Sequence, residues 1–277
     1  MSIEVKNLSF CYNRGTSLEK HAIDNISFSI GKGEFVLIGG EVGSGKSTLA
    51  RHLNGLLRPQ SGSVTIDGKA AGSRKVRSKA GLLMQYPQKQ LFGRTVYEDV
   101  AFAPSNFGFK GKELDEHVMY ALGLAGLDGS VASLSPFSLS GGQMRLVALA
   151  GVLSMKPDYL ILDEPASGLD PDNRVLLIGT LEKLHRSGIS IVVISHQLSE
   201  LLSLAEKIII LKSGRIEFVG SVPEYLRSAP FTLPEITSLM KELNLAGINV
   251  GDDIYSVDDA FSEIIRFFGS PEARLDE

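Results

Sequence analysis

Short apolar runs alternate with longer helical stretches along most of the chain. The alternation of apolar and polar residues at 3–5 and 26–30 predicts half-buried strands, whereas the unbroken run Phe35–Ile38 predicts a strand buried on both faces. Strands alternating with helices indicate an α/β fold, with a mostly parallel sheet between helices. Further apolar strands are predicted around residues 64–66, 82–84, 159–162, 191–194, 208–211 and 216–218.

The strand pattern disappears between about residues 95 and 155, where helix formers dominate and predict a helical insertion. Other helical stretches are expected at about 173–186 and 197–204, and a helix after the glycines that follow residue 38 would place Leu49, Leu53 and Leu56 on one face. Pro223, Pro230 and Pro234 mark a boundary, and a short, mostly helical tail follows them.

The composition excludes several classes of protein but does not indicate a function. Among 277 residues, 28 Lys and Arg stand against 32 Asp and Glu, a net charge of −4 that disfavours a general nucleic-acid binder. The single cysteine, Cys11, excludes an intrachain disulfide and a cluster built from cysteines. No signal-peptide-like stretch opens the chain, and no apolar run approaches the length of a membrane span, so we expect any membrane role to depend on a partner.

A glycine-rich stretch follows the buried run, and Gly40–Ser47 reads G-x-x-x-x-G-K-S. Glycines let backbone N–H groups approach phosphate oxygens, and the following helix adds its positive N-terminal end. Lys46 suits the β- and γ-phosphates, and the Ser47 hydroxyl suits Mg²⁺. A plain glycine-rich turn is the alternative, but the strand before the loop and the helix after it favour a phosphate site.

Two further motifs carry chemistry. The apolar run 160–162 ends in Asp163 and Glu164, at the edge of a parallel sheet where ligands bind. Asp163 could reach Mg²⁺ there and Glu164 could act as general base, although solvated acids at a strand end are common. The stretch 139–143 reads LSGGQ and predicts a second anion site at a helix N-terminus, or otherwise a simple helix cap.

In this order and spacing, the motifs resemble those of ATP-binding-cassette (ABC) ATPases over about residues 1–225. Individually Tyr12, Gln85 and His196 would be unremarkable, but they match the adenine-stacking aromatic, the Q-loop and the H-loop, and 167–170 match the D-loop. The resemblance implies a P-loop NTPase (RecA-like) core, an N-terminal antiparallel β subdomain, a helical insertion and a short C-terminal extension. We expect a nucleotide-binding domain over 1–228, its helical subdomain at about 93–156, and an extension over 229–277 that helps two ATPases to pair.

The resemblance also assigns roles. It implies ATP and Mg²⁺ as ligands, with two ATP molecules held between two cassettes, so that a second ABC ATPase chain, the same or related, completes each site. The implied catalytic residues are Glu164, His196, Gln85 and Lys46; the implied metal residues are Ser47, Gln85 and Asp163; and the implied nucleotide-binding residues are Tyr12, Gly40, Glu41, Val42, Gly43, Ser44, Gly45, Lys46, Ser47, Thr48, Ser140, Gly141, Gly142, Gln143 and Asp170.

A finer resemblance rests on the extended Q-loop at 85–92, which ends in Leu91 and Phe92, and on the tail from Leu233. Both are similar to the ATPases of energy-coupling factor (ECF) transporters, which import vitamins and transition-metal ions. That resemblance implies a peripheral position on the cytoplasmic face of the cell membrane, with a transmembrane coupling protein, a substrate-binding membrane protein and no nucleic acid as partners. A soluble ABC ATPase that remodels a macromolecular complex, a conventional importer ATPase and a nucleotide-gated switch are the alternatives.

Two departures from the family pattern stand out. Leu146 takes a place where a basic surface residue is usual, and Ser195 replaces the more usual Thr before the H-loop histidine. Neither removes a catalytic group. Cys11 and the remaining histidines match no family motif and are expected to be structural; these histidines are His21, His52, His117 and His185.

Overall fold

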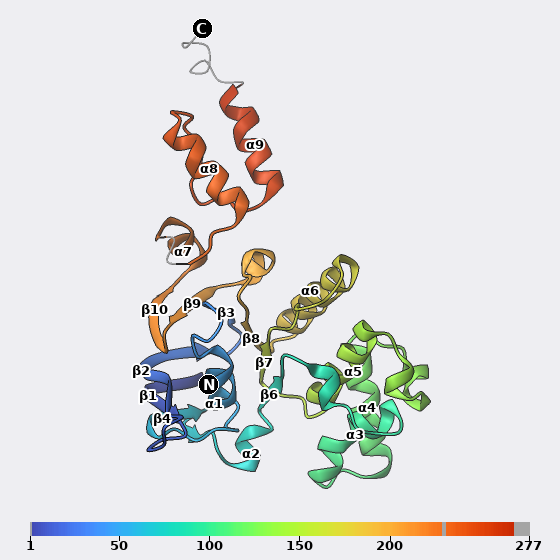
Figure 1. Ribbon diagram of the computed structural model, residues 1–277. Coiled ribbons are helices and arrows are strands. Elements are labelled where there is room, and N and C mark those ends of the chain that lie inside the picture. Colours follow the sequence, from blue (N-terminus) through green and yellow to red (C-terminus); the bar gives the residue numbers. More distant parts are fainter. Residues whose placement is uncertain (1, 229–230, 269–277) are drawn as a thin grey trace.

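The computed structural model describes residues 2–228 and 231–268, which fold around two β-sheets (Figure 1). The smaller sheet is antiparallel, as the alternation near the N-terminus predicts. A tight turn at Asp67 and Gly68, with φ of 51° and 74°, joins its last two strands. Its strand order is β2-β1-β4-β5, with β1 (Ser2–Tyr12), β2 (Lys20–Gly31), β4 (Ser61–Ile66) and β5 (Lys69–Ala70).

The larger sheet is parallel except for one edge hairpin. Its inner strands β3, β7 and β8 are buried along their whole length, which explains why their sequences are continuously apolar. The turn at Ser213 and Gly214 closes the edge hairpin. The strand order is β10-β9-β3-β8-β7-β6, with β3 (Phe35–Gly39), β6 (Ala80–Leu83), β7 (Tyr159–Asp163), β8 (Ser190–Ile194), β9 (Lys207–Lys212) and β10 (Arg215–Gly220).

The larger sheet separates two apolar cores. Alternate residues of β3 point to opposite faces, so Phe35 and Leu37 join the core shared with the helical insertion. Val36 and Ile38 join the core shared with the antiparallel sheet. The α/β architecture with an N-terminal antiparallel sheet is therefore confirmed.

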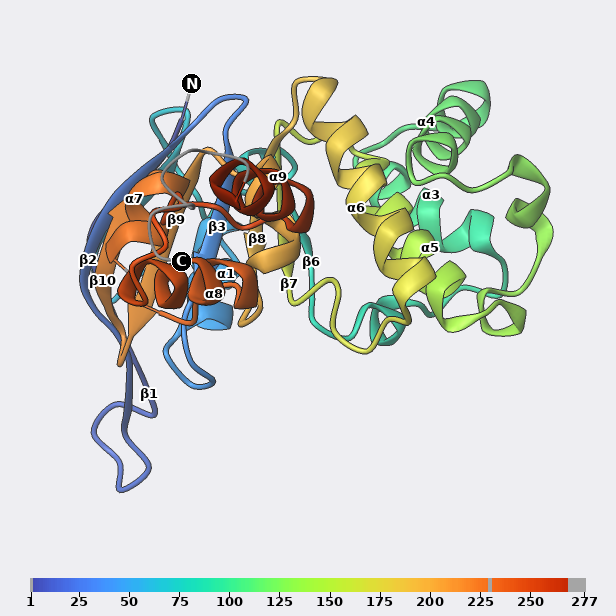
Figure 2. The ribbon, with the colours of Figure 1, turned by 90° about the horizontal axis from the view of Figure 1, so that it is seen from above.

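Helices replace strands between residues 95 and 155, as predicted. Thr95 caps the first of them through the Glu98 N–H, and a buried apolar face on each helix packs against the others. Figures 1 and 2 both place these helices on the opposite side of the molecule from β1 and β2. They are α3 (Val96–Asn106), α4 (Gly111–Leu124) and α5 (Gly141–Leu153), with η2 (Gly129–Ser133) and η3 (Pro136–Ser138) between the last two.

The remaining helices flank the larger sheet and correct two expectations. Leu56 does not continue the face of α1, because the chain turns at Gly55, whose φ of 77° ends the helical path, and Leu56 is exposed. The helix expected at 197–204 is a shorter 3₁₀ helix, η4. These elements are α1 (Lys46–Leu53), α2 (Arg74–Arg77), η1 (Pro87–Gln90), α6 (Pro171–Arg186), η4 (Ser199–Leu204) and α7 (Val222–Ser228).

The C-terminal helices α8 (Glu235–Leu245) and α9 (Val257–Phe268) stand apart from the sheets around a small apolar cluster of their own (Figure 1). Met240, Val250 and Ala260 are its buried members. Of the expected extension over 229–277, residues 229–230 and 269–277 lie outside the described part. Within the described residues, every helix is too short or too polar to cross a bilayer.

Candidate nucleotide site

The glycine-rich loop connects the end of β3 to the start of α1. Two of its glycines are required by close backbone contacts: a Cβ on Gly40 would lie 2.1 Å from the Leu211 carbonyl oxygen, and one on Gly45 would lie 2.3 Å from that of Ala22. Both have positive φ, 141° and 103°. The loop is thereby held against neighbouring strands, with the N-terminus of α1 at its end.

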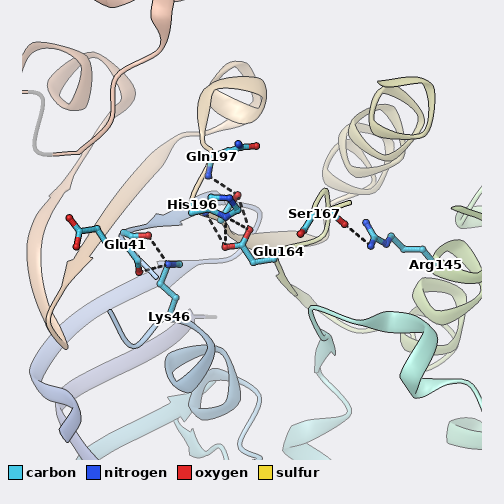
Figure 3. A network of polar contacts seen from close by, with 9 residues as sticks. Glu41, Lys46, Arg145, Glu164, Ser167, His196 and Gln197 are labelled. Atoms are coloured by element: carbon cyan, nitrogen blue, oxygen red, sulfur yellow. Dashed lines mark hydrogen bonds and ion pairs between the residues drawn. The ribbon is translucent and has the colours of Figure 1, made fainter. Parts of the chain in front are cut away.

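Lys46 is buried at the centre of this loop. Its Nζ donates to the Gly40 carbonyl at 2.6 Å and to the Glu41 carbonyl at 2.8 Å (Figure 3). Burial lowers the pKa of this ammonium, and the negative charges of Glu164 and Asp163 oppose that shift. The lysine is therefore a desolvated cation that an additional anion would stabilise.

Asp163 ends β7 close to the Ser47 hydroxyl, which acts to lower the pKa of its carboxyl group. Burial raises the pKa of its carboxyl group, and the neighbouring charge of Glu164 adds to this effect. Its Oδ1 is buried and has no hydrogen-bond partner among the described residues. An unpartnered buried carboxylate oxygen next to a serine hydroxyl is a donor set that Mg²⁺ would satisfy.

Glu164 and His196 are brought together by the pairing of β7 with β8, in which Asp163 lies opposite Ile194. His196 Nδ1 lies 2.9 Å from both carboxylate oxygens of Glu164, and the His196 backbone N–H donates to Oε1 at 3.1 Å. Glu164 is nearly buried, whereas the imidazole is half exposed. Ser195 adds a hydroxyl donor to Oε2 at 3.3 Å, a supporting contact that the sequence did not predict.

Lys46, Glu164 and His196 line a cavity of about 260 Å³. Gln85 reaches it from the segment after β6, and Tyr12 reaches it from the end of β1, where its hydroxyl lies 3.2 Å from Thr48 Oγ1. Lys20 and Ala22, which had no predicted role, also contribute to its wall. The lining residues are Tyr12, Lys20, Ala22, Val42, Gly43, Gly45, Lys46, Ser47, Thr48, Gln85, Glu164 and His196.

The rest of the loop divides into two parts. Glu41, Val42 and Gly43 are exposed at the mouth of the loop. Ser44 is buried, and its Oγ has no hydrogen-bond partner among the described residues. Ser44 Oγ is therefore, beside Asp163 Oδ1, a second buried polar atom without a hydrogen-bond partner in the described part of the chain.

The LSGGQ residues build a helix N-terminus elsewhere. Ser140 and Gln143 cap α5 reciprocally, each side chain bonding the other's backbone N–H. Gly142 contacts α6, because a Cβ there would lie 2.4 Å from Asn173 Oδ1. Asp170 caps α6 through the Asn173 N–H at 2.9 Å. The cavity wall contains none of the residues 139–143, so one described chain does not bring the two predicted anion sites together.

Arg145 joins the LSGGQ helix to the turn after β7, a contact that the sequence did not predict. Its guanidinium donates to the Pro165 carbonyl and, at 2.9 Å, to the Ser167 carbonyl (Figure 3). Burial lowers its pKa. The expectation that Leu146 takes the place of a surface charge is wrong, because Leu146 is buried in the core of the helical insertion. Its neighbour Arg145 is the residue that makes the polar contact.

The apolar pair at the end of the extended Q-loop separates into a core residue and a surface residue. Leu91 is buried in the core, whereas Phe92 is 61% exposed and stacks edge-on against Phe102, with ring centroids 4.7 Å apart. The backbone N–H groups of Phe92 and Gly93 both donate to Asp99 Oδ1, at 2.9 Å each. The exposed ring is therefore presented from a rigid turn.

Comparison with known proteins agrees with this geometry. The ABC transporter family profile matches residues 23–167. A putative ABC transporter ATP-binding protein of Methanosarcina mazei is 47% identical over 96% of this chain and 93% of its own. The energy-coupling factor transporter ATP-binding protein EcfA2 of Caldanaerobacter subterraneus is 40% identical over 96% of this chain and 98% of its own.

Two solved structures have the same fold. CbiO1 from Clostridium perfringens, described as part of the ABC transporter complex cbiONQ, has a TM-score of 0.73 at 33% identity, over 88% of this chain and 94% of its own. A dimeric ATP-binding cassette in a post-hydrolysis state with ADP and Pi has a TM-score of 0.71 at 30% identity, over 79% and 98%. With the phosphate loop, the acidic strand end and the LSGGQ helix all in one α/β fold, the chain belongs to the ATP-hydrolysing subunits of ABC transporters.

Proposed function

We propose that this chain hydrolyses ATP to energise import of a micronutrient, a vitamin or a transition-metal ion, through an ECF-type ABC transporter. The observation that carries the hydrolytic part is the convergence of Lys46, Glu164 and His196 on one cavity, with the charge of Asp163 acting on Lys46 beside it. The ECF part is supported by the relatives that bear this name and by the exposed Phe92 at the end of the extended Q-loop.

Nucleotide binding follows from a buried cation, Lys46, and from the unpartnered carboxylate oxygen of Asp163. The γ-phosphate would take the place of the backbone carbonyls as the partner of Lys46, and the loop N–H groups would hold the other phosphate oxygens. Tyr12 would stack on adenine. Ser47 and Asp163, with Gln85, would hold Mg²⁺, which when bound neutralises charge on the β- and γ-phosphates.

Hydrolysis requires a base beside the γ-phosphate. Glu164 accepts hydrogen bonds from His196 and Ser195 and is therefore fixed at the end of β7, where it would orient water and remove its proton. His196 lies on the open side of this carboxylate and would stabilise the γ-phosphate. Gln85 would connect the site to the helical insertion.

A second ATPase chain would complete each site. Ser140, Gly141, Gly142 and Gln143 form an exposed helix N-terminus outside this chain's own cavity, a position that suits a phosphate bound by a partner. Asp170, at the start of α6, would communicate between the two chains. ATP binding would then close the pair and hydrolysis would open it. Because phosphoryl transfer depends chiefly on positioned charges, the site would be active only when the two chains are closed around ATP.

The membrane partners would be a coupling protein and a substrate-binding protein, with this chain peripheral on the cytoplasmic face. Phe92 projects from the turn that Asp99 holds, next to the segment that brings Gln85 into the site. An apolar helix face of the coupling protein would bury this ring. The nucleotide-binding domain at 1–228 would provide both the nucleotide site and the surface around Phe92. The extension at 229–277 would help the two ATPases to pair.

Purification of the tagged chain from detergent-solubilised membranes of its native host tests the proposal. Mass spectrometry should find a multi-spanning coupling protein and a small substrate-binding membrane protein, and the latter would identify the substrate. Phe92→Ser should reduce their recovery without changing ATP affinity. Phe137→Ser, with the same exposure of 61%, is the matched control. Recovery of soluble proteins alone would retain the ATPase and overturn the transporter role.

A further inference from the structure

Three metal-ligating side chains converge where β1 and β2 meet their connecting loop. Cys11 Sγ, a Glu19 carboxylate oxygen and a His21 imidazole nitrogen all lie within 4.8 Å of one another. Cys11 and His21 are directly opposite in the antiparallel pair, so their side chains share one face of the hairpin. Sequence reasoning had assigned both residues a structural role.

The carboxylate of Glu19 is held ready between the other two groups. The Gly15 N–H donates to its Oε2 at 2.7 Å, and its Oε1 lies 3.2 Å from His21 Nε2. Such hydrogen bonding to a ligating carboxylate is typical of metal sites, where outer contacts orient the ligands. The imidazole is 77% exposed, so the cluster is open to solvent on this side, while the thiol is buried behind it.

We propose that Cys11, Glu19 and His21 bind one borderline divalent cation, of which Zn²⁺ is the type, with solvent as a fourth ligand. Ligand atoms around one tetrahedral Zn²⁺ lie roughly 3.4–3.7 Å apart, given bonds of about 2.0–2.3 Å. Side-chain rotations that move these ligand atoms by about an ångström would bring them to that spacing. Thiolate, imidazole and carboxylate together select Zn²⁺ or Co²⁺ over Mg²⁺ and Ca²⁺. Binding releases the Cys11 proton, now shared with the Tyr12 carbonyl at 3.3 Å, to solvent.

The cluster lies at the base of the loop that connects β1 and β2, on the opposite face of these strands from the nucleotide cavity. Successive residues of a strand point to opposite faces, and Tyr12 and Lys20, the neighbours of Cys11 and His21, line the nucleotide cavity. Figure 2 shows the loop after β1 projecting away from both sheets. A bound cation would tie the two strands together at the base of this loop. The cluster lies on the opposite face of the hairpin from the nucleotide cavity, so cation binding there does not depend on ATP hydrolysis.

Titration of the nucleotide-free chain with Co²⁺ tests the site directly. A thiolate-to-Co²⁺ charge-transfer band should grow to one equivalent per chain, and Zn²⁺ should displace it. Cys11→Ser should abolish the band. His21→Gln should weaken Co²⁺ binding at least about tenfold. Removing even a residue that only hydrogen-bonds to a metal ligand costs about tenfold or more in affinity, and His21 would be a ligand itself. Because His21 is so exposed, this variant tests the proposal even if Cys11→Ser fails to fold.

A histidine elsewhere in the fold serves as a control. His185 Nε2 lies 3.6 Å from Glu206 Oε1, a histidine–glutamate pair outside the cluster, and His185→Gln should leave the Co²⁺ affinity unchanged. Arg14→Gln should tighten binding several-fold, because the charge of Arg14 acts on both Cys11 and Glu19 and opposes a cation. Zn²⁺ should also slow hydrogen exchange of the amides at 13–19. A band that persists in Cys11→Ser, equal losses in the two histidine variants, or no binding at millimolar Co²⁺ would each overturn the site.

Discussion

Replacing Glu164 by glutamine isolates the hydrolytic step from nucleotide binding. The glutamine has nearly the same shape and keeps one oxygen that can accept from the His196 N–H, but it cannot take a proton from water. A general base contributes typically about 10²–10⁴ in rate, so the barrier should rise by about 3–5 kcal/mol. Lys46 and the loop amides are unchanged, and ATP should therefore bind normally.

The stability of the variant should change little, because two effects oppose each other. The neutral side chain weakens the charge-assisted contact with His196, whose Nδ1 lies 2.9 Å away. It also removes a negative charge that adds to the effect of burial in raising the pKa of Asp163. Thermal melting without nucleotide should therefore give a transition close to that of the wild type.

The assay combines steady-state ATP hydrolysis, titration with a fluorescent ATP analogue and sedimentation with and without ATP. Glu164→Gln should be hydrolytically impaired, should retain its ATP affinity and should accumulate as an ATP-dependent dimer. The same substitution at an exposed glutamate on α8, Glu242→Gln, is the control and should behave as wild type. Turnover within about fivefold of wild type would refute the base assignment, since even the weakest general base is worth about 10².

Three further predictions follow from named contacts. Lys46→Ala should weaken ATP binding by about 10- to 100-fold, because a hydrogen bond to a charged group contributes about 1.5–3 kcal/mol; fluorescence titration measures this, and unchanged affinity would contradict the role of the loop. Gly142→Ala should lower ATP turnover and spare ATP binding, since its Cβ would lie 2.4 Å from Asn173 Oδ1, on a side chain that is hydrogen-bonded to Asp170. Adding Asn173→Ala removes the contacted atoms and should restore turnover, and a double variant as slow as Gly142→Ala would contradict this explanation. Burial raises the pKa of Asp67, but hydrogen bonds, chiefly from Lys79, outweigh it and lower the pKa in the folded state. The ionised carboxylate therefore stabilises the fold above the unfolded-state pKa of 3.8. This stabilisation is lost as the pH falls through the lower pKa of the folded state. Asp67→Asn should thus flatten the decline in melting temperature below about pH 5, and an unaltered acid limb would exclude this linkage.

The strands and the order of motifs were predictable from the sequence because they depend on local pattern. A continuous apolar run such as Phe35–Ile38 forms a strand buried on both faces, and the structure has one there. Helix ends were less predictable, because Leu56 fits the apolar face but Gly55 packs against the Ala71 carbonyl, a contact from a distant segment. Periodicity reports which face is buried and not where tertiary contacts end the helix.

Some contacts of the site were likewise predictable from the sequence, and others were not. Lys46 and Ser47 lie in one continuous motif, and the meeting of Glu164 with His196 follows from the neighbouring carboxyl ends of parallel strands. The contacts of Arg145 with the carbonyls after β7 depend on how a helix of the insertion approaches the sheet. Short motifs do not encode that approach, so the polar residue beside Leu146 went unassigned.

Three unfavourable features meet at the sheet edge that holds the nucleotide site. Glu164 has a φ of 51°, a conformation that costs a residue with a Cβ roughly 1–2 kcal/mol. Asp163 has a buried oxygen without a partner, and burial lowers the pKa of Lys46. A phosphate would partner the lysine and a divalent cation would partner the aspartate, so ligand binding would stabilise the fold through these two groups. Unfavourable groups of the nucleotide-free fold therefore lie at the carboxyl ends of the strands where the family performs its chemistry.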